Sequence, residues 1–342
     1  NSNFGDLDNY SFEPRISARY LLADEWSIKS SYAAMRQNIH LLSNTSVGFP
    51  SDIWVPAIDS VPSQTSHQWA ASLNTQLYGG EYELSLEGYY KTMHNLIAYK
   101  AGYRSLDGSE GRSWSDAVET GGEGKSYGLE LFLQKKKRNT TGWIGYTLSW
   151  TKRQFDNLNF GDWYPYKYDR RHDLSIVLSH TFNKRQVLSK KVKVKDNKFI
   201  DISYEIDSPV ADIISPRSKE KWWNISATWV YGTGNAITFP QAIYFGMPEN
   251  EWGDYIYVDD VESYGERNSA RMPAYHRLDV GFNSHTRRSS GVESVWSFGA
   301  YNAYNRKNPY FAYLGYTNNN ERVAQQVSLF GRIPSISYQL TF

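Results

Sequence analysis

The sequence predicts an all-β fold, a membrane-spanning antiparallel β-barrel, and three observations support that prediction. Apolar and polar residues alternate in segments of about ten residues, the pattern of barrel strands that show one face to lipid. Aromatic residues make up 16% of the 342 residues, with 27 Tyr and 12 Trp. The last of the alternating segments ends on an aromatic residue, Phe342.

The C-terminal segment, Ser335–Phe342, is the clearest of these strands. Its apolar side chains share one face of an extended strand, and the polar side chains between them share the other. Barrels of bacterial outer membranes end in this way, because the barrel-assembly machinery recognises a terminal amphipathic strand that closes on Phe. We therefore assign an assembly signal to Ile336, Tyr338, Leu340 and Phe342.

The composition agrees with a barrel and excludes several other classes. The mean hydropathy is −0.61, and no run approaches the ~18 apolar residues that a transmembrane helix requires. Tyr and Trp suit the girdles at both membrane–water boundaries of a barrel. Cysteine is absent, so there is neither a disulfide framework nor a thiolate metal site. The net charge of +1 gives no reason to expect a nucleic-acid partner.

Roughly eleven strands follow from the alternation. Gly79-Gly80 marks a tight turn between two of them, since glycine adopts positive φ freely. The expected strands lie near 14–22, 26–34, 69–77, 82–90, 127–133, 144–150, 174–182, 223–231, 278–282, 296–305 and 336–342. The side chains expected to face lipid include Trp69, Leu73, Leu84, Leu86, Leu131, Leu148, Leu178 and Leu340.

The connections between these strands are short and long in turn. The long ones lie near 39–66, 100–124, 156–168, 232–270 and 305–322. Barrels of this kind have short periplasmic turns and long extracellular loops, so the long connections are expected outside the cell.

One periplasmic connection, 183–220, is longer than this rhythm predicts. It contains the charged run Lys190–Lys195 and then the alternating run Phe199–Ile206. We interpret the segment as an inserted, solvated β-hairpin beneath the barrel. A docking surface for a periplasmic partner is the alternative.

The strand order carries an inference about completeness. The last strand should end in the periplasm, so the first strand should run inward from an extracellular position. An odd number of strands that begins outside does not close into an antiparallel barrel. The chain also begins without a signal-peptide pattern. We therefore expect that the preceding half of the barrel is missing from this chain.

Six short motifs stand in order along the chain: Asp52–Pro56, Asp169–His172, Tyr231–Asn235, Arg271–Asp279, Tyr301–Pro309 and Arg332–Pro334. Together they resemble TonB-dependent outer-membrane receptors, most closely those typical of Bacteroidetes. The resemblance spans roughly residues 14–342. The family has a 22-stranded barrel with a plugged lumen, so this chain would be the C-terminal half of the barrel.

The resemblance also implies a function and a set of partners. The family imports a scarce ligand, of the siderophore, cobalamin, haem or glycan class, across the outer membrane of Gram-negative bacteria. The partners would be the N-terminal barrel half, a plug domain, the TonB complex acting through the plug, the barrel-assembly machinery and the lipid bilayer. The plug and the TonB box have no counterpart in this sequence, and the insertion at 183–220 departs from the usual short turn.

The aromatic residues of the long connections are the candidate ligand-binding residues. Aromatic side chains with polar neighbours suit stacking on sugar rings, haem or aromatic chelators, although they could instead anchor the barrel rim at the interface. An acidic stretch in 232–270 could hold a cation through oxygen ligands, but its spacing matches no calcium loop. We therefore predict no metal and no cofactor. The candidate residues are Trp54, Trp114, Trp163, Tyr164, Tyr166, Trp252, Tyr255 and Tyr257.

The sequence does not indicate an enzyme. Gly121–Ser126 imitates a phosphate-binding loop, but Glu119 occupies the earlier glycine position and a strand follows instead of a helix. His172 and Asp173 have no positioned serine nearby in the sequence. Two other functions remain as alternatives, a passive outer-membrane porin and a soluble secreted glycan-binding β-protein.

Overall fold

The computed structural model describes residues 11–44, 52–100, 113–182, 186–194, 198–206, 219–246, 258–288, 290–319 and 321–342. Nearly all of the regular structure in these residues is β-strand. Two short 3₁₀ helices, η1 (Trp114–Ala117) and η2 (Asn159–Gly161), lie in the long connections. Among the described residues, no helix is both long and apolar enough to cross a membrane.

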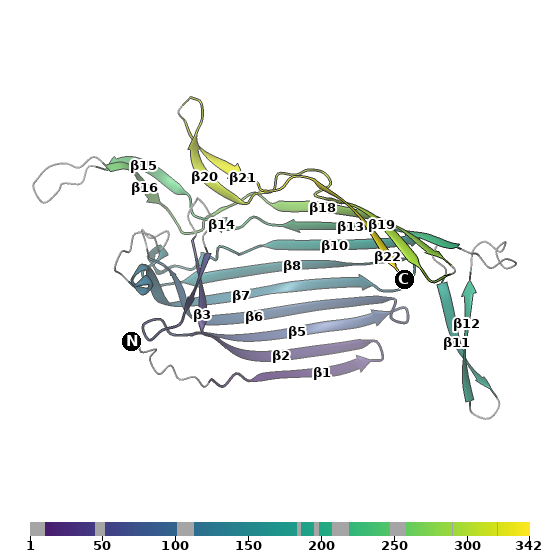
Figure 1. The fold of residues 1–342 in the computed structure, drawn as a ribbon. Coiled ribbons are helices and arrows are strands. Elements are labelled where there is room, and N and C mark those ends of the chain that lie inside the picture. The colour runs from purple at the N-terminus through teal and green to yellow at the C-terminus, as the bar shows by residue number, and fades with distance from the viewer. Residues whose placement is uncertain are drawn as a thin grey trace, which may run out of the picture.

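One large antiparallel sheet dominates the structure, and its eleven main strands follow one another in chain order (Figure 1). The two-residue strand β9 (Tyr164–Pro165) adds to the side of this sheet by pairing with β8. The fold class and strand number predicted from the sequence are confirmed. The main strands are β1 (Arg15–Ala23), β2 (Trp26–Gln37), β5 (Gln64–Leu77), β6 (Tyr82–Tyr99), β7 (Val118–Lys135), β8 (Thr140–Gln154), β10 (His172–Phe182), β13 (Lys219–Gly232), β18 (Tyr275–Arg288), β19 (Glu293–Tyr301) and β22 (Ile333–Thr341).

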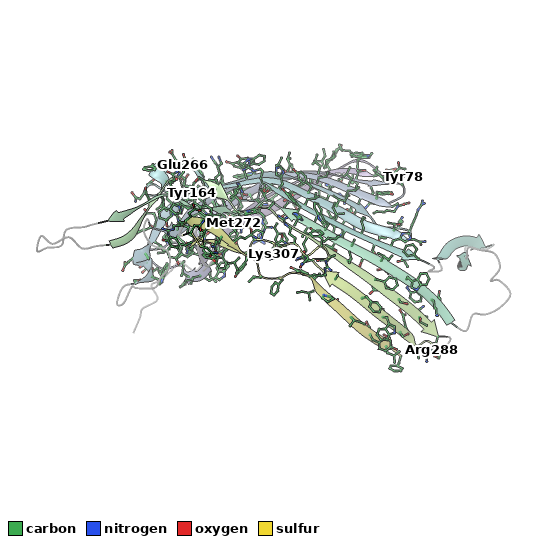
Figure 2. The ribbon with its side chains drawn as sticks, turned by 90° about the horizontal axis from the view of Figure 1, so that it is seen from above. Tyr78, Tyr164, Glu266, Met272, Arg288 and Lys307 are labelled. Atoms are coloured by element: carbon green, nitrogen blue, oxygen red, sulfur yellow. The ribbon has the colours of Figure 1, made fainter. Side chains whose placement is uncertain are left out.

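The two ends of the sheet differ in their connections. Short turns at 24–25, 78–81 and 136–139 and the short connection between Arg288 and Glu293 join strand pairs at one end, which we call the turn end. Long connections leave the opposite end, which we call the loop end. The Gly-Gly pair lies in the four-residue turn 78–81. Tyr78, Gly79 and Gly80 all have positive φ there, a conformation that glycine adopts freely. Figure 2 shows Tyr78 and Arg288 at the turn end and Tyr164 and Glu266 at the loop end.

Most of the long connections contain small hairpins of their own. β3 (Ile39–Ser43) pairs with β4 (Asp52–Pro56), and β20 (Phe311–Tyr316) pairs with β21 (Arg322–Val327). The connection from β13 to β18 holds two nested pairs. These are β14 (Ala236–Ile237) with β17 (Ala270–Arg271) and β15 (Pro240–Gly246) with β16 (Val258–Tyr264).

The segment between β10 and β13 also forms a hairpin. β11 (Gln186–Val194) pairs antiparallel with β12 (Lys198–Ile206) as a separate two-stranded sheet. Figure 1 shows this hairpin extending from the turn end, away from the main sheet.

The main sheet has one apolar and one polar face. Directly paired residues of neighbouring strands point to the same side of a sheet. Leu73 pairs with Leu86, and Leu86 pairs with Leu131. Following such pairs across the sheet places all eight side chains predicted to face lipid on a single face: Trp69, Leu73, Leu84, Leu86, Leu131, Leu148, Leu178 and Leu340.

The residues between these positions form the opposite face, which is polar. Asn74 illustrates this on β5, since its side chain donates a hydrogen bond to Ser72 and accepts one from Ser85, each at 2.9 Å. The period of two along each strand therefore separates the two environments across the whole sheet.

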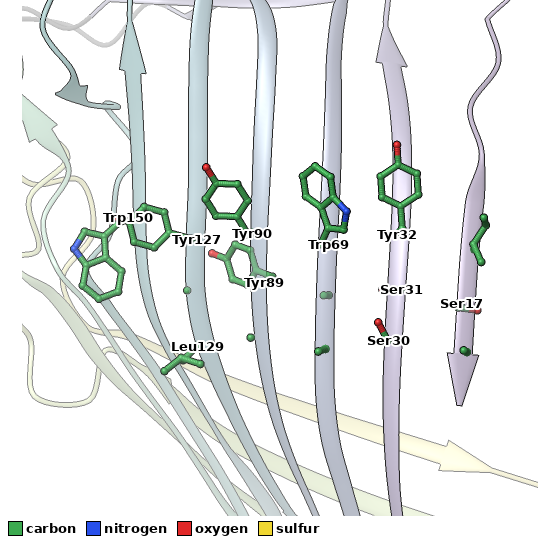
Figure 3. A pocket seen from close by; sticks show the side chains of 16 residues that line it. Ser17, Ser30, Ser31, Tyr32, Trp69, Tyr89, Tyr90, Tyr127, Leu129 and Trp150 are labelled. Atoms are coloured by element: carbon green, nitrogen blue, oxygen red, sulfur yellow. The ribbon is translucent and has the colours of Figure 1, made fainter. Parts of the chain in front are cut away.

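Aromatic residues border the apolar face. The loop-end row runs across five neighbouring strands, and its successive ring centroids lie 5.4–6.3 Å apart (Figure 3). Tyr90, in this row, and Tyr82, near the turn end, are eight residues apart on β6. That spacing is about 26 Å along a strand, close to the ~25 Å apolar band of outer-membrane barrels. The loop-end row consists of Tyr32, Trp69, Tyr90, Tyr127 and Trp150.

The buried core is small and lies at the loop end. One cluster joins the β3–β4 hairpin to the end of β6 through Leu42, Val55 and Ile97. A second cluster packs Leu96 against Phe155 and other residues of the β8–β10 connection. The core therefore fixes the long connections against the sheet.

The main sheet is open in the described structure. β1 and β22 are its edges, and each has a single neighbouring strand. Both edge strands run toward the turn end, because β1 enters the turn to β2 and β22 pairs antiparallel with β19. Seen from above, the sheet curves between the strands that end near Tyr78 and the strand that ends at Arg288 (Figure 2).

Candidate functional site

The loop end holds a network of hydrogen bonds that joins the long connections. Asp169 lies near its centre and is 2% exposed. Its carboxylate accepts a hydrogen bond from the backbone N–H of Thr151 at 2.6 Å and another from the guanidinium of Arg271. Arg171 lies 3.6 Å from the same carboxylate. This acid therefore links the end of β8 to β17.

Asp52, in strand β4, makes a second link. Lys167 Nζ donates to its carboxylate at 2.8 Å, and the hydroxyl of Tyr168 donates to the other oxygen. Burial and the hydrogen bond to Asp52 raise the pKa of Tyr168 above its usual range, so this hydroxyl stays protonated and keeps donating. The β3–β4 hairpin is thereby held against the β8–β10 connection.

The connection after β19 is fixed in the same way. The backbone N–H of Asn302 donates to Asp279 at 2.8 Å, and His276 Nδ1 lies 2.7 Å from the Tyr304 hydroxyl. The backbone N–H of Arg332 donates to the side chain of Asn305 at 2.8 Å. These bonds tie β18 to the last long connection.

All six sequence motifs contribute residues to this loop-end network. Thr233 completes the set, since its backbone N–H donates to the His172 carbonyl at 2.9 Å and its hydroxyl accepts from the His172 N–H at 2.7 Å. The motifs therefore meet in space although they are far apart in the chain. Their residues position the long connections.

A pocket of about 180 Å³ opens beside this network, and we call it the Arg153 pocket. Arg153 is the only charged residue among the described residues that line it. A smaller hollow next to it is also lined by Arg153, together with Tyr164, Tyr166 and Arg267. The lining of the Arg153 pocket consists of Gln37, Leu41, Trp54, Gln64, Leu96, Ile97 and Arg153.

Arg153 lies at the end of β8, on the polar face of the sheet. Its guanidinium stacks over the Tyr166 ring at 3.6 Å from the centroid, and Nη1 donates to the Ile97 carbonyl at 3.4 Å. Its Nε is shielded from solvent and has no hydrogen-bond partner among the described residues. Burial lowers the pKa of Arg153, but a guanidinium stays charged at neutral pH.

Arg267 is arranged similarly on the other side of the tyrosines. Its guanidinium lies 5.5 Å from the Tyr164 ring centroid, and Nη1 donates to the Tyr99 carbonyl at 3.4 Å. Burial lowers the pKa of Arg267, and the nearby charge of Arg153 lowers it further. Two cations thus lie close together at the loop end.

The structure brings together some of the predicted ligand-binding residues and separates others. Tyr164 and Tyr166 stack with the two arginines, and Trp54 lines the Arg153 pocket. Trp163 instead lies under Lys125, whose Nζ is 3.8 Å from its ring centroid. Trp114 packs against the Leu42 cluster. The predicted residues Trp252, Tyr255 and Tyr257 lie outside the described residues.

Arg153 and Arg267 were not predicted from the sequence. Alternation places Arg153 on the polar face, where an arginine is ordinary, and nothing in the sequence around Arg267 distinguishes it. Within the described part of the chain, no group of three or more His, Asp or Glu side chains is placed to hold a metal ion.

A larger hollow of about 730 Å³ lies on the apolar face. The loop-end aromatic row forms its upper border (Figure 3), and small residues such as Ala71 and Gly88 also line it. Few polar groups line this hollow, so it offers little to orient a polar ligand.

The solved structures that are similar to the chain include two of FpvA. No family model and no curated protein matches the chain. One structure is that of FpvA from P. aeruginosa bound to a heterologous pyoverdine with iron, at 13% identity and a TM-score of 0.45, over 95% of this chain and 32% of that one. The other is the FpvAI–pyocin S2 complex, also at 13% identity and a TM-score of 0.45, over 96% of this chain and 32% of that one. The chain thus spans about a third of the length of the structures it is similar to.

Proposed function

We propose that this chain forms half of the barrel wall of a TonB-dependent receptor in the bacterial outer membrane. The main support is the single apolar face that crosses all eleven strands and is bordered at the loop end by an aromatic row. Leu178 is 50% exposed and Ile336 is 65% exposed on this face. An apolar surface of this extent is unfavourable in water and is stabilised by lipid.

The polar face would then line the lumen. Polar side chains such as Asn74 and Ser85 lie on it together with charged ones such as Glu87, and some hydrogen-bond across strands, as between Asn224 and Ser179 at 2.7 Å. A lumen of this kind suits a water-filled passage or contact with a plug domain. The open sheet leaves room for a second barrel segment to complete the wall.

The loop end would be the extracellular mouth. The six motifs that resemble TonB-dependent receptors, most closely those of Bacteroidetes, all lie in the hydrogen-bond network there. The network positions the long connections around the lumen, where a ligand would first bind. The proposed ligand belongs to the siderophore, cobalamin, haem or glycan class.

The remaining partners follow from the same proposal. A plug domain and the TonB complex would supply coupling to the inner membrane, and the barrel-assembly machinery would insert the chain through its terminal strand. We assign no catalytic role to any residue. The receptor would bind and translocate its ligand unchanged.

Uptake in whole cells tests the proposal. Cells that carry the intact gene should accumulate the ligand in the periplasm, and both removal of TonB and collapse of the proton gradient should abolish accumulation. Uptake that persists without TonB would indicate a porin instead. Recovery of the protein in the aqueous fraction without detergent would indicate a soluble protein and would contradict the membrane assignment.

A further inference from the structure

We propose that the Arg153 pocket binds the carboxylate of a small molecule that carries an aromatic ring or a similar apolar body. The inference deepens the proposed function, because it gives the chemical class of one group on the imported ligand. It rests on three features of the loop end: an unmatched pair of cations, the size and lining of the pocket, and the fixed orientation of Arg153.

The first feature is the absence of a counter-charge. Three other loop-end cations each have an acid partner: Arg271 with Asp169, Lys167 with Asp52, and Arg277 with Asp279 at 2.9 Å. Among the described residues, no carboxylate lies within 4.0 Å of Arg153 or Arg267. Charged groups that are withdrawn from water are normally paired, so an anion at this position would be stabilised.

The second feature is the lining of the pocket. Leu41, Leu96 and Ile97 supply apolar walls, and the Trp54 indole lies at the rim, 61% exposed. The volume of about 180 Å³ is close to that of an engineered cavity of ~150 Å³ that holds benzene. A ring of that size fits against these walls, with its charged substituent toward Arg153.

Arg153 favours an anion over a cation in this pocket, and the neighbouring polar groups add no charge. Gln37 and Gln64 line it with amides, and each amide nitrogen already donates a hydrogen bond, to the Ile39 carbonyl at 2.8 Å and to His40 Nδ1 at 3.0 Å. Burial lowers the pKa of His40, so this neighbour is neutral at pH 7 and does not add charge. Arg153 is therefore the group that would hold the ligand's charge.

The third feature is that Arg153 is held in place before a ligand arrives. Stacking on Tyr166 and the bond to the Ile97 carbonyl fix the plane of its guanidinium. Arginine has five N–H donors, and a carboxylate pairs with two of them at once. Since the Nε–H has no partner among the described residues, binding there leaves no existing bond of that group to break.

Binding of benzoate and of benzamide to the assembled, detergent-extracted receptor tests the inference. The two probes have nearly the same shape, and only benzoate is charged at pH 7. Saturation-transfer NMR should show benzoate binding that R153Q weakens about tenfold or more, as expected for loss of a charged hydrogen bond. R153K should retain part of the affinity, because it keeps the charge and loses the paired donors.

The matched control is K152Q, which removes a positive charge from the adjacent residue on the apolar face of the same strand. It should leave benzoate binding unchanged. W54A should weaken benzoate and benzamide alike, because it removes a wall and no charge. Unfolding temperatures close to the wild-type value show that each variant has folded.

The outcomes separate this inference from the proposed function. Equal affinity for benzoate and benzamide, or no benzoate binding in the assembled receptor, overturns the carboxylate site whatever the uptake result. The second of these would be expected if an acidic side chain from another part of the receptor already fills the pocket. Arg153-dependent benzoate binding without TonB-dependent uptake supports the site and overturns the proposed function.

Discussion

Asp169 and Arg271, which are 102 residues apart in the chain, form an ion pair that joins two long connections at the loop end. Arg271 also donates to the Asp169 carbonyl at 2.5 Å and to the Gly234 carbonyl at 3.3 Å. The guanidinium of Arg271, on β17, thus connects to the β8–β10 connection and to the residues just after β13. Both residues belong to motifs that the sequence singled out, and the structure gives those motifs an architectural role.

Asp169→Asn should destabilise the folded loop end. Removing one partner of a buried ion pair leaves the other charge uncompensated and costs about 3–5 kcal/mol. The temperature at which the folded form is lost in detergent should fall clearly. Asp173→Asn is the control, because its carboxylate is 44% exposed, 3.3 Å from Arg170, and such pairs contribute only ~0–1 kcal/mol. Equal shifts for the two variants would contradict the structural role of Asp169.

Leu86→Arg should disrupt folding into lipid bilayers. Leu86 lies on the apolar face of β6, and an arginine near the midplane of a barrel's lipid face costs ~2–4 kcal/mol. Ser85→Arg places the same residue one position away on the polar face and should be tolerated. Denaturant titration in lipid vesicles measures both. A larger loss for Ser85→Arg would reverse the assignment of the two faces.

Phe342→Ala should lower the amount of protein in the outer membrane with little effect on the stability of the folded barrel. Phe342 is 93% exposed, so its removal forfeits almost no packing. We expect its role to be recognition during assembly. Thr341→Ala, on the opposite face of the strand, is the control. Normal outer-membrane levels of Phe342→Ala would remove the basis for an assembly signal.

Glu81→Gln should reduce the dependence of stability on acid pH. The hydrogen bond from Lys135 at 2.6 Å is the main cause that lowers the pKa of Glu81, and the charge of Arg138 adds to it. A carboxyl with a lowered folded-state pKa stabilises the fold above its unfolded pKa of about 4.3, and this stability is lost as the pH falls through the folded-state value.

The wild type should therefore lose stability on acidification below about pH 4.3, whereas Glu81→Gln should be less stable at pH 7 and flatter in the acid range. Unfolding temperatures measured across this pH range test the expectation. Asp24→Asn, an exposed carboxyl in the turn between β1 and β2, is the control. If the stability of Glu81→Gln falls on acidification as much as that of the wild type, a group other than Glu81 causes the loss.

The 342-residue chain refolded alone should associate or aggregate. The edges β1 and β22 present unpaired N–H and C=O groups, which are costly in lipid and pair readily with other chains. Analytical ultracentrifugation in detergent should show a broad distribution of sizes. A single monomeric species in which β1 pairs with β22 would contradict this expectation.

The strands and their faces were predictable because alternation is a local property. A shift of one residue would turn every apolar side chain to the polar face, so the pattern fixes the register. The strand lengths were less predictable. The apolar pattern of β6 fades after Tyr90, yet its pairing with β7 continues to Tyr99. Backbone hydrogen bonds continue beyond the apolar band, where the side chains no longer need to alternate.

The candidate site was only partly predictable because separate segments assemble it. The cluster of aromatic residues in one loop includes Tyr164 and Tyr166, which line a small hollow beside Arg153, while their predicted role in ligand binding stays a prediction. The same cluster included Trp163, which lies apart under Lys125. Arg153 and Arg267 come together only through the packing of the β8–β10 connection against the end of the β13–β18 connection, as in the bond from the Arg267 N–H to Asn159 at 2.7 Å. No local pattern encodes that contact.

The equal direction of β1 and β22 limits what could close the barrel. In a second copy of this sheet in the same membrane orientation, both edge strands would also run toward the turn end. Each pairing of edge strands between the two copies would therefore be parallel. An antiparallel seam on each side requires a segment whose two outer strands start at the turn end and finish at the loop end. Such a segment has an odd number of strands, as this sheet does, but its strands run in the direction opposite to the corresponding strands of this sheet. Self-association therefore cannot build an antiparallel barrel from this sheet, and only an unlike polypeptide segment can.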